Sequence, residues 1–321
     1  CQGYSTLGHR RSYGVPKDQI PSNFLYKEML RTIRALQPKT FVFENVKGLL
    51  LGRWNSSEEQ GSVWSTVFGD FLGLSRQGYQ VAAALVHARD YGVPQNRPRL
   101  LIVWIHSDFG VLPAGESWGD ELFALDAVKR GFLPPPSRLK APGPRALLDD
   151  LVDPGYVPGQ LFTSRYESSA RTKVAREFRT CPDGYVLRAG DPVLEQDYSR
   201  HAPRTVERFK ALQEAARSGR PVPSRLATRK FSQRVLPEAW GKQGPTITVT
   251  SMPDDYLHYC QPRSLTVREC ARLQTFPDWY EFEGNRTTGG LRRAGNPIEG
   301  IHRRDLPKYT QVANAVPVWL A

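Results

Sequence analysis

The sequence predicts an α/β fold, in which a small sheet with flanking helices is followed by a mixed and irregular region. Apolar residues recur at helical spacing over residues 23–36, and three β-rich runs follow between residues 40 and 105. From about residue 107 the chain becomes rich in proline, glycine and charged side chains. We therefore expect one regular α/β portion and a second portion that contains only short elements.

The first portion begins with a loop over residues 1–20, because glycine, proline and polar side chains interrupt any apolar period there. The helix predicted over 23–36 ends before Pro38. Thr40–Phe43 is then expected to be a short buried strand that delivers Glu44 at its C-terminal end. Ligands of open α/β sheets bind at such strand ends, so this carboxyl group is well placed for chemistry.

A second helical pattern covers about residues 61–75, and two further β-rich runs, Tyr79–His87 and Arg99–Ile105, follow it. The intervening Asp90–Pro98 segment has turn composition, so the two runs are predicted to form a hairpin. This hairpin carries the polar residues Gln95, Arg97 and Arg99.

The region 107–240 contains only two clear helical patterns, Pro144–Leu151 and Pro203–Arg217, and Gly244–Thr250 is β-rich. We find no internal repeat. Later in the chain, Thr266 precedes Glu269 by three residues in a capping-box pattern, which predicts the start of a helix with a mainly structural role.

The composition favours a polyanionic partner. The formal net charge is +12 and the isoelectric point is about 9.7, and residues 201–250 hold ten Lys or Arg against three Asp or Glu. Such an excess is typical of proteins that bind nucleic acid. A solvated helix face explains any single basic residue equally well. The candidates for phosphate contact are Arg200, Arg204, Arg208, Arg225, Arg229, Lys230 and Arg234.

The cysteines predict neither a disulfide framework nor a metal site. Cys1, Cys181, Cys260 and Cys270 form no Cys-x-x-Cys pair, so we expect no bound metal. Free thiols are typical of a reducing, cytoplasmic setting. No apolar run approaches the ~18 residues that a membrane span requires.

Five short motifs follow one another along the chain: Cys1-Gln2-Gly3-Tyr4-Ser5, Glu44-Asn45-Val46, Gln95-Asn96-Arg97-Pro98-Arg99, Arg263–Asp278 and Ala313-Asn314-Ala315-Val316-Pro317. In this order they resemble the motifs of the DNA cytosine-5 methyltransferases of bacterial or phage restriction–modification type. That family has a proline before the nucleophilic cysteine, which is missing here, and a glycine where this chain has Ala313. The resemblance extends over the whole chain.

The resemblance implies a partial Rossmann-like, class I methyltransferase sheet beside a mixed, irregular target-recognition domain. It assigns residues 1–106 to a partial catalytic domain and residues 107–262 to the target-recognition domain. Residues 263–321 are then a C-terminal segment that supports the recognition domain and returns to the catalytic domain.

The reaction implied by the resemblance is methyl transfer from S-adenosylmethionine to C5 of a cytosine flipped out of double-stranded DNA. C5 is a poor nucleophile, and addition of a thiolate at C6 raises its electron density. In the family's scheme Cys1 is the nucleophile, Glu44 lies at N3 and Arg99 lies near O2, where negative charge builds up on the ring.

The resemblance also gives roles to other polar residues of the five motifs. It places Arg97 close to the DNA backbone and the nucleophile loop, and it places Asn314 near the cofactor. The residues expected near the DNA are Gln2, Ser5, Asn45 and Gln95.

The family's main cofactor motifs, a Phe-x-Gly-x-Gly loop and acidic residues after the next strands, precede the nucleophile and do not occur in this chain. We therefore expect a fragment that is inactive alone. Three explanations stay open: truncation of the sequence, a partner polypeptide that carries those motifs, or protein splicing in which Cys1 directly follows an intein.

Two other functions are compatible with the motifs. One is a non-catalytic DNA-binding subunit or fragment, which would hold cytosine without a cofactor. The other is an RNA cytosine-5 methyltransferase of the same fold. The large region between residues 107 and 240 favours duplex DNA, because reading a duplex site requires an extended surface.

Overall fold

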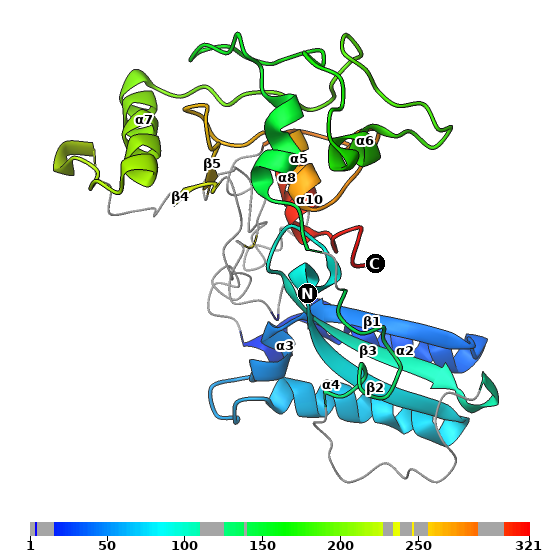
Figure 1. Cartoon of the computed structure of the whole chain (residues 1–321). Coiled ribbons are helices and arrows are strands. Elements are labelled where there is room, and N and C mark those ends of the chain that lie inside the picture. Colours follow the sequence, from blue (N-terminus) through cyan, green and yellow to red (C-terminus); the bar gives the residue numbers. More distant parts are fainter. Residues whose placement is uncertain are drawn as a thin grey trace. The chain divides into compact units, whose positions relative to one another are not determined.

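The chain contains helices and sheet in two compact units (Figure 1). Unit 1 comprises Cys1–His87 and Pro98–Ser137, and unit 2 comprises Ala88–Arg97 and Arg138–Ala321. The structure, a computed structural model, describes residues 4, 16–109, 125–137, 140–226, 234–237, 246, 256–287 and 305–321. The expectation of a mixed α/β architecture is confirmed at this level.

Unit 1 is built on a three-stranded sheet of order β1-β3-β2 (Figure 1). β1 (Thr40–Val46) and β2 (Tyr79–His87) both pair antiparallel with the central strand β3 (Pro98–His106). The predicted hairpin is therefore confirmed as β2 and β3. The described strands of unit 1 form an antiparallel sheet, which leaves the Rossmann-like arrangement a prediction.

β1 differs from its prediction in length and burial. It continues three residues beyond Phe43, so Glu44 lies within the strand instead of following it. The expectation of a buried strand was wrong, because Val42 is 51% exposed. In the described sheet β1 is an edge strand with β3 as its only neighbour, so part of its surface stays open to solvent.

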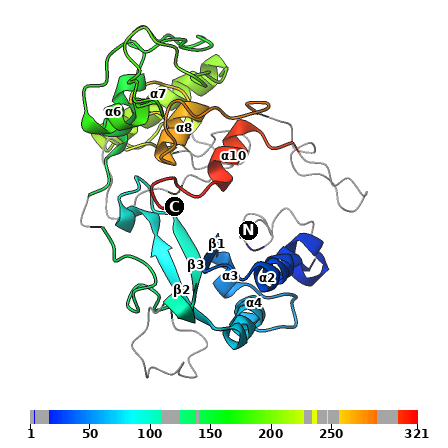
Figure 2. The ribbon, with the colours of Figure 1, turned by 90° about the vertical axis from the view of Figure 1, so that its right-hand side faces the viewer.

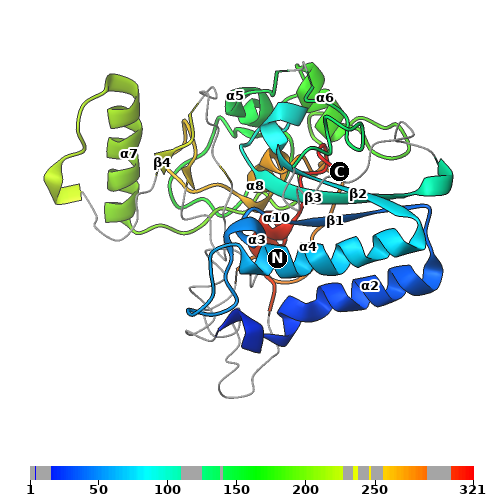
Figure 3. The same ribbon diagram turned by 90° about the horizontal axis from the view of Figure 1, so that it is seen from below.

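Helices α2 (Leu25–Leu36) and α4 (Ser62–Leu72) lie alongside each other over one face of the sheet (Figures 1 and 3). Both were predicted from their apolar spacing. A short helix, α3 (Gly48–Leu51), follows β1. Aromatic side chains fill the space between helices and sheet, and the rings of Phe71 and Trp104 lie 4.6 Å apart. This core holds the sheet that carries Glu44 and Arg99.

The segment after β3 also belongs to unit 1. The backbone N–H of Ala127 donates a hydrogen bond to the carbonyl of Ala83 in β2, at 2.9 Å. The compact unit thus extends to Ser137, beyond residue 106, where the catalytic domain was predicted to end. The extension arises because the chain returns to β2 after β3.

Unit 2 has its own core, to which four of its described helices contribute: α5 (Pro144–Leu148), α6 (Lys173–Arg179), α8 (Val267–Leu273) and α10 (Lys308–Asn314) (Figure 1). Figure 2 shows α6, α8 and α10 from a second direction. Their buried apolar side chains include Leu147, Leu148, Phe178, Leu273 and Tyr309. Segments predicted to belong to recognition and C-terminal regions therefore share one hydrophobic core.

The longest helix in the described part of unit 2, α7 (Pro203–Ser218), lies near the small parallel pair of β4 (Arg234–Val235) and β5 (Tyr256–Leu257) (Figure 1). The predictions of α5 and α7 are confirmed, whereas α6 was not predicted. The β-rich segment Gly244–Thr250 lies outside the described residues except for Thr246. None of the helices in the described part of the chain is long and apolar enough to cross a membrane.

Helix α8 begins with the capping box that its sequence predicted. The Thr266 hydroxyl accepts a hydrogen bond from the Glu269 backbone N–H at 3.1 Å, and the Glu269 carboxylate accepts one from the Thr266 N–H at 2.9 Å. These bonds satisfy donors that a helix N-terminus otherwise leaves unpaired.

Candidate active site

Glu44 and Arg99 form an ion pair in unit 1, with 2.6 Å between Oε1 of Glu44 and Nε of Arg99. Glu44 lies opposite Leu101 and Arg99 lies opposite Val46, so the pair is diagonal across β1 and β3. Because side chains alternate along a strand, both project from the sheet face opposite the one that packs against α2 and α4. The fold therefore brings these two predicted site residues together.

The ion pair is only partly accessible. The side chains are 8% exposed for Arg99 and 25% for Glu44. Burial lowers the pKa of Arg99, and the neighbouring Glu44 carboxylate partly offsets that effect. The guanidinium nevertheless remains charged at neutral pH. It also donates a hydrogen bond to the Pro98 carbonyl at 2.8 Å, which fixes its direction.

Such a pair can act on a polar ring in two ways. A fixed guanidinium stabilises negative charge that develops on an oxygen atom, and a carboxyl group exchanges a proton or hydrogen bond with a ring nitrogen. Asn45 is directed differently: it is 3% exposed, and its side-chain oxygen accepts a hydrogen bond from the Val46 N–H at 2.9 Å.

Gln95 and Arg97 belong to unit 2, whereas Arg99 of the same motif belongs to unit 1. The Gln95 amide donates to the Leu273 carbonyl at 2.8 Å and to Oε1 of Gln274 at 2.5 Å. Arg97 donates to the carbonyl of Ala313. Both side chains are almost completely buried. The structure thus gives them partners in α8 and α10 that the sequence did not indicate.

Asn314 is the last residue of α10, and its side chain is exposed. Ala313 before it is helical and lies outside the positive-φ region that would require glycine. Alanine is therefore compatible with the backbone at the position where the resembling motif has glycine.

Cys1, Gln2 and Ser5 lie outside the described residues. Tyr4, in the same motif, is 6% exposed, and burial raises its pKa to about 12. Its hydroxyl donates a hydrogen bond to the Asn23 carbonyl, and its ring meets Trp54 edge-on. Tyr4 itself is thus packed into the core of unit 1, a position that sequence reasoning did not predict.

The described residues supply only one predicted contact for a nucleotide-like cofactor. α10 ends at Asn314 and leaves its amide exposed, so the amide can donate and accept hydrogen bonds there. None of the described strands is followed by a Gly-x-Gly turn of the kind that holds dinucleotides. Nor does any group of three His, Cys, Asp or Glu side chains in the described part of the chain lie close enough to hold a metal ion.

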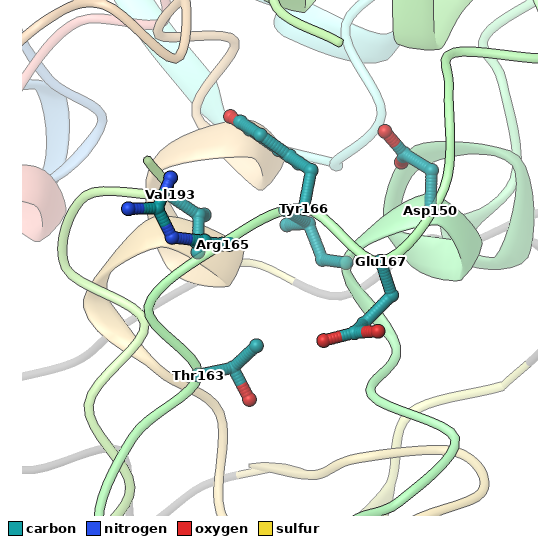
Figure 4. A pocket seen from close by; sticks show the side chains of 7 residues that line it. Asp150, Thr163, Arg165, Tyr166, Glu167 and Val193 are labelled. Carbon is teal, nitrogen blue, oxygen red and sulfur yellow. The ribbon is translucent and has the colours of Figure 1, made fainter. Parts of the chain in front are cut away.

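A small pocket opens in unit 2 beside Asp150, Thr163 and Tyr166 (Figure 4). None of its lining residues is a predicted site residue. The Tyr166 hydroxyl donates to Asp278 at 2.7 Å, and Asp150 is ion-paired with Arg179 and Arg272. These groups are already partnered, so the pocket edge belongs to a structural ion network.

A family model described as C-5 cytosine-specific DNA methylase matches residues 1–321. The chain belongs to this family. The resemblance inferred from the five motifs is thereby confirmed. Methyltransferases of this family generally use S-adenosylmethionine as the methyl donor.

The relatives that this chain matches include Type II methyltransferases. M.DdeI of Desulfomicrobium norvegicum is 28% identical over 336 residues, which cover 100% of this chain and 68% of that protein. M.BspRI of Lysinibacillus sphaericus and M.BsuRI of Bacillus subtilis are each 29% identical over the full chain. The chain spans only 56% and 55% of the lengths of these two relatives.

A solved structure has a similar fold. The crystal structure described as a DNA modification methyltransferase encoded within an E. coli prophage aligns with a TM-score of 0.54 and 20% identity. The alignment covers 92% of this chain and 71% of that one. At 20% sequence identity, this structural similarity supports a shared fold and does not by itself support a shared function.

The basic residues predicted to contact phosphate lie on and around α7. Arg200, Arg204, Arg225 and Arg234 are exposed, and Arg208 is half-buried. Arg225 forms an exposed ion pair with Glu207 at 2.9 Å, and Arg234 lies over the ring of Tyr256. Arg229 and Lys230 lie outside the described residues.

Proposed function

We propose that this chain is the catalytic and target-recognition part of a DNA (cytosine-5-)-methyltransferase. It would bind double-stranded DNA, flip a cytosine from the stack and direct a methyl group from S-adenosylmethionine to C5. Membership of the C-5 cytosine-specific DNA methylase family supports the reaction class. The observation that carries the site is the Glu44–Arg99 pair, which presents an acid and a cation side by side on one sheet face.

In this proposal the Cys1 thiolate forms a bond to C6 of the flipped cytosine, and the C5–C6 π electrons move toward C5 and the N3–O2 edge. A protonated Glu44 donates to N3, and the Arg99 guanidinium stabilises the charge at O2. C5 would then take the methyl group as the bond between that group and the donor's sulfonium sulfur breaks, which leaves the donor as a neutral thioether. A base then removes the C5 proton. The released electron pair then restores the C5–C6 double bond and expels Cys1 as thiolate.

The remaining predicted residues would support binding. Asn314 would hold part of the methyl donor, and Arg97 would contribute charge near the DNA backbone. Gln2, Ser5, Asn45 and Gln95 stay predicted DNA-proximal residues, although the amide nitrogen of Gln95 is occupied by Leu273 and Gln274. The other contacts to the donor would come from a preceding segment or a separate polypeptide, and the chain alone would then be inactive.

The test is bisulfite sequencing of DNA from cells that express the chain joined to the cofactor-binding segment. We expect methylated cytosine at one defined sequence, and no methylation with Cys1→Ser. Tritiated methyl transfer by the purified chain alone should stay at background. Tight DNA binding without methylation in the completed protein would instead favour a non-catalytic DNA-binding subunit, and methylated RNA would favour the RNA enzyme.

A further inference from the structure

The C-terminal end of α10 is anchored by side chains from outside the helix. The last carbonyls of a helix lack intrahelical partners and need other donors. Here the Val312 carbonyl accepts a hydrogen bond from Nε2 of Gln274 at 2.7 Å, and the Ala315 carbonyl accepts one from the same nitrogen at 3.2 Å. The Ala313 carbonyl accepts from Arg97, whose positive charge suits a helix C-terminus.

These anchored carbonyls lie on both sides of Asn314. The Asn314 side chain is exposed, while Val312 and Ala313 are buried in the core of unit 2. The backbone on either side of Asn314 is therefore held by these donors.

Gln274 is the residue that connects the anchors. It is completely buried, and its side-chain oxygen accepts from Gln95 while its nitrogen donates to the end of α10. One amide thus joins the 88–97 loop, the end of α8 and the end of α10, all within unit 2.

The backbone beside Gln274 adds to this anchoring. The carbonyl of Gln274 accepts from the Val318 N–H at 3.2 Å, and the Thr275 hydroxyl accepts from the Trp319 N–H at 3.0 Å. Thr275 has φ of 62°, an uncommon conformation for a β-branched residue. The surrounding bonds hold this conformation, so the turn that places Gln274 is fixed.

We propose that Gln274 is a positioning residue for methyl transfer, which acts by fixing the end of α10 and thereby the direction of Asn314. The inference rests on the proposed function, since Asn314 is a predicted donor contact. Gln274 itself is completely buried, so we expect it to act through Asn314 and not by contact with either substrate. Substitution of Gln274 should therefore raise the KM for the methyl donor more than the KM for DNA.

The first test measures hydrogen exchange in the purified chain. Gln274→Met keeps the length of the side chain and removes its polar atoms. We expect the amides of Val312–Ala315 to exchange roughly tenfold faster, because the helix end loses two hydrogen bonds. The matched control is Gln213→Met, because the buried Gln213 amide donates to the carbonyls of His258 and Gln261 at 2.8 Å each.

The control decides between local anchoring and general loss of stability. Gln213→Met should leave exchange in Val312–Ala315 within about twofold of the original chain, because its bonds lie elsewhere in unit 2. Equal acceleration in both variants, or none in Gln274→Met, would overturn the proposal.

The second test measures methyl transfer by the completed enzyme. For Gln274→Met we expect the KM for S-adenosylmethionine to rise about fivefold or more, with kcat and the KM for DNA within about twofold. Gln274→Glu keeps the acceptor for Gln95 but loses the amide donor to α10, so it should resemble Gln274→Met. A fall in kcat with an unchanged donor KM would refute the positioning role.

No methyl transfer by the unmodified enzyme would overturn the proposed function, whereas the exchange comparison would still decide whether Gln274 anchors α10.

Discussion

At the scale of single residues, the Glu44–Arg99 pair combines two properties that a reactive site needs. It is held by adjacent strands of a packed sheet, so its geometry is fixed before any substrate binds. It also remains partly open, since a quarter of the Glu44 side chain is exposed. Preorganised charge of this kind is effective because it needs little rearrangement during the reaction.

We expect Glu44→Gln in the completed enzyme to lower kcat by a factor of about 10²–10⁴, the range for loss of a general acid. The fold should be retained, because the amide can still accept a hydrogen bond from Arg99, but stability should fall because the buried guanidinium loses its counter-charge. The control is Glu28→Gln, which removes an exposed ion pair with Arg31 in the same unit. Initial rates of tritium transfer to DNA measure the effect, and equal rates in both variants would remove Glu44 from the mechanism.

His258 predicts a pH dependence of stability. It is fully buried, and burial together with the nearby Arg263 lowers its pKa from 6.5 to about 3, although Glu269 opposes this shift. In the unfolded chain His258 binds a proton below pH 6.5, whereas in the folded chain it stays neutral down to about pH 3. The free energy of unfolding is therefore highest above pH 6.5 and falls as the pH drops toward 3.

Urea denaturation at pH 7 and pH 5 tests this sign. The buried histidine should reduce the free energy of unfolding by up to about 1.4 kcal/mol per pH unit below its unfolded pKa. Glu269 does not obscure the comparison: burial alone would raise its pKa, but the neighbouring Arg263 guanidinium lowers it to about 2. The contribution of Glu269 to the free energy of unfolding is fully present above pH 4.5 and is lost only as the pH falls through about 2. His258→Gln should show a smaller loss between pH 7 and 5, and an identical loss would contradict the assignment.

At the scale of elements, α8 and its flanking residues are held by buried ion pairs. Arg272 pairs with Asp150 at 2.5 Å and with Asp278 at 2.6 Å, and Arg263 pairs with Glu269 at 2.6 Å. Burial alone would raise the pKa of Asp150, but Arg272 and Arg179 together lower it. These pairs join α8 to segments before and after it. The charged side chains of Arg263–Asp278 therefore have a mainly structural role.

Removing one partner from such a network leaves an uncompensated buried charge. We therefore expect Arg272→Ala to destabilise unit 2 by about 3–5 kcal/mol. Arg217→Ala is the matched control, because its pair with Glu214 on α7 is exposed and should contribute less than about 1 kcal/mol. Chemical denaturation followed by tryptophan fluorescence measures both variants. A similar small change in the two would show that the network contributes little to stability.

The elements that sequence predicted correctly are those with a local signal. Each of these signals comes from residues that are close together in the sequence. They are the apolar spacing of α2 and of α4, the β-rich runs of β2 and β3, and the capping box of α8. By contrast, Gln95 meets Leu273 across 178 positions of the sequence and Arg97 meets Ala313 across 216. No local pattern encodes such contacts, so the partners of these two motif residues could not be predicted. The exposure of β1 was also missed, because burial of a short apolar strand depends on which strands lie next to it.

At the scale of the whole molecule, the net charge of +12 bears on the proposed DNA binding more than on the fold. The exposed arginines of the α7 region belong to unit 2, together with the segments predicted to form the recognition and C-terminal regions. Electrostatic contacts of this kind release counterions, so binding should weaken steeply as salt rises. The slope of that dependence reports how many basic residues contact phosphate.

Individual arginines in this region should contribute unequally to that slope. In the described part of the chain Arg204 has no carboxylate within ion-pair distance, and its guanidinium donates to the carbonyl of Arg225 at 3.4 Å. The charge of Arg225 is already paired with Glu207. We expect Arg204→Ala to weaken binding to all duplex sequences and to reduce the salt slope by about 1, whereas Arg225→Ala should change the slope by less.

Fluorescence anisotropy with one duplex at four salt concentrations measures both variants, and Arg31→Ala in unit 1 serves as the control for net charge. If all three variants shift the slope equally, the basic region near α7 is not the DNA-binding surface, and the excess charge acts only through the general field of the protein.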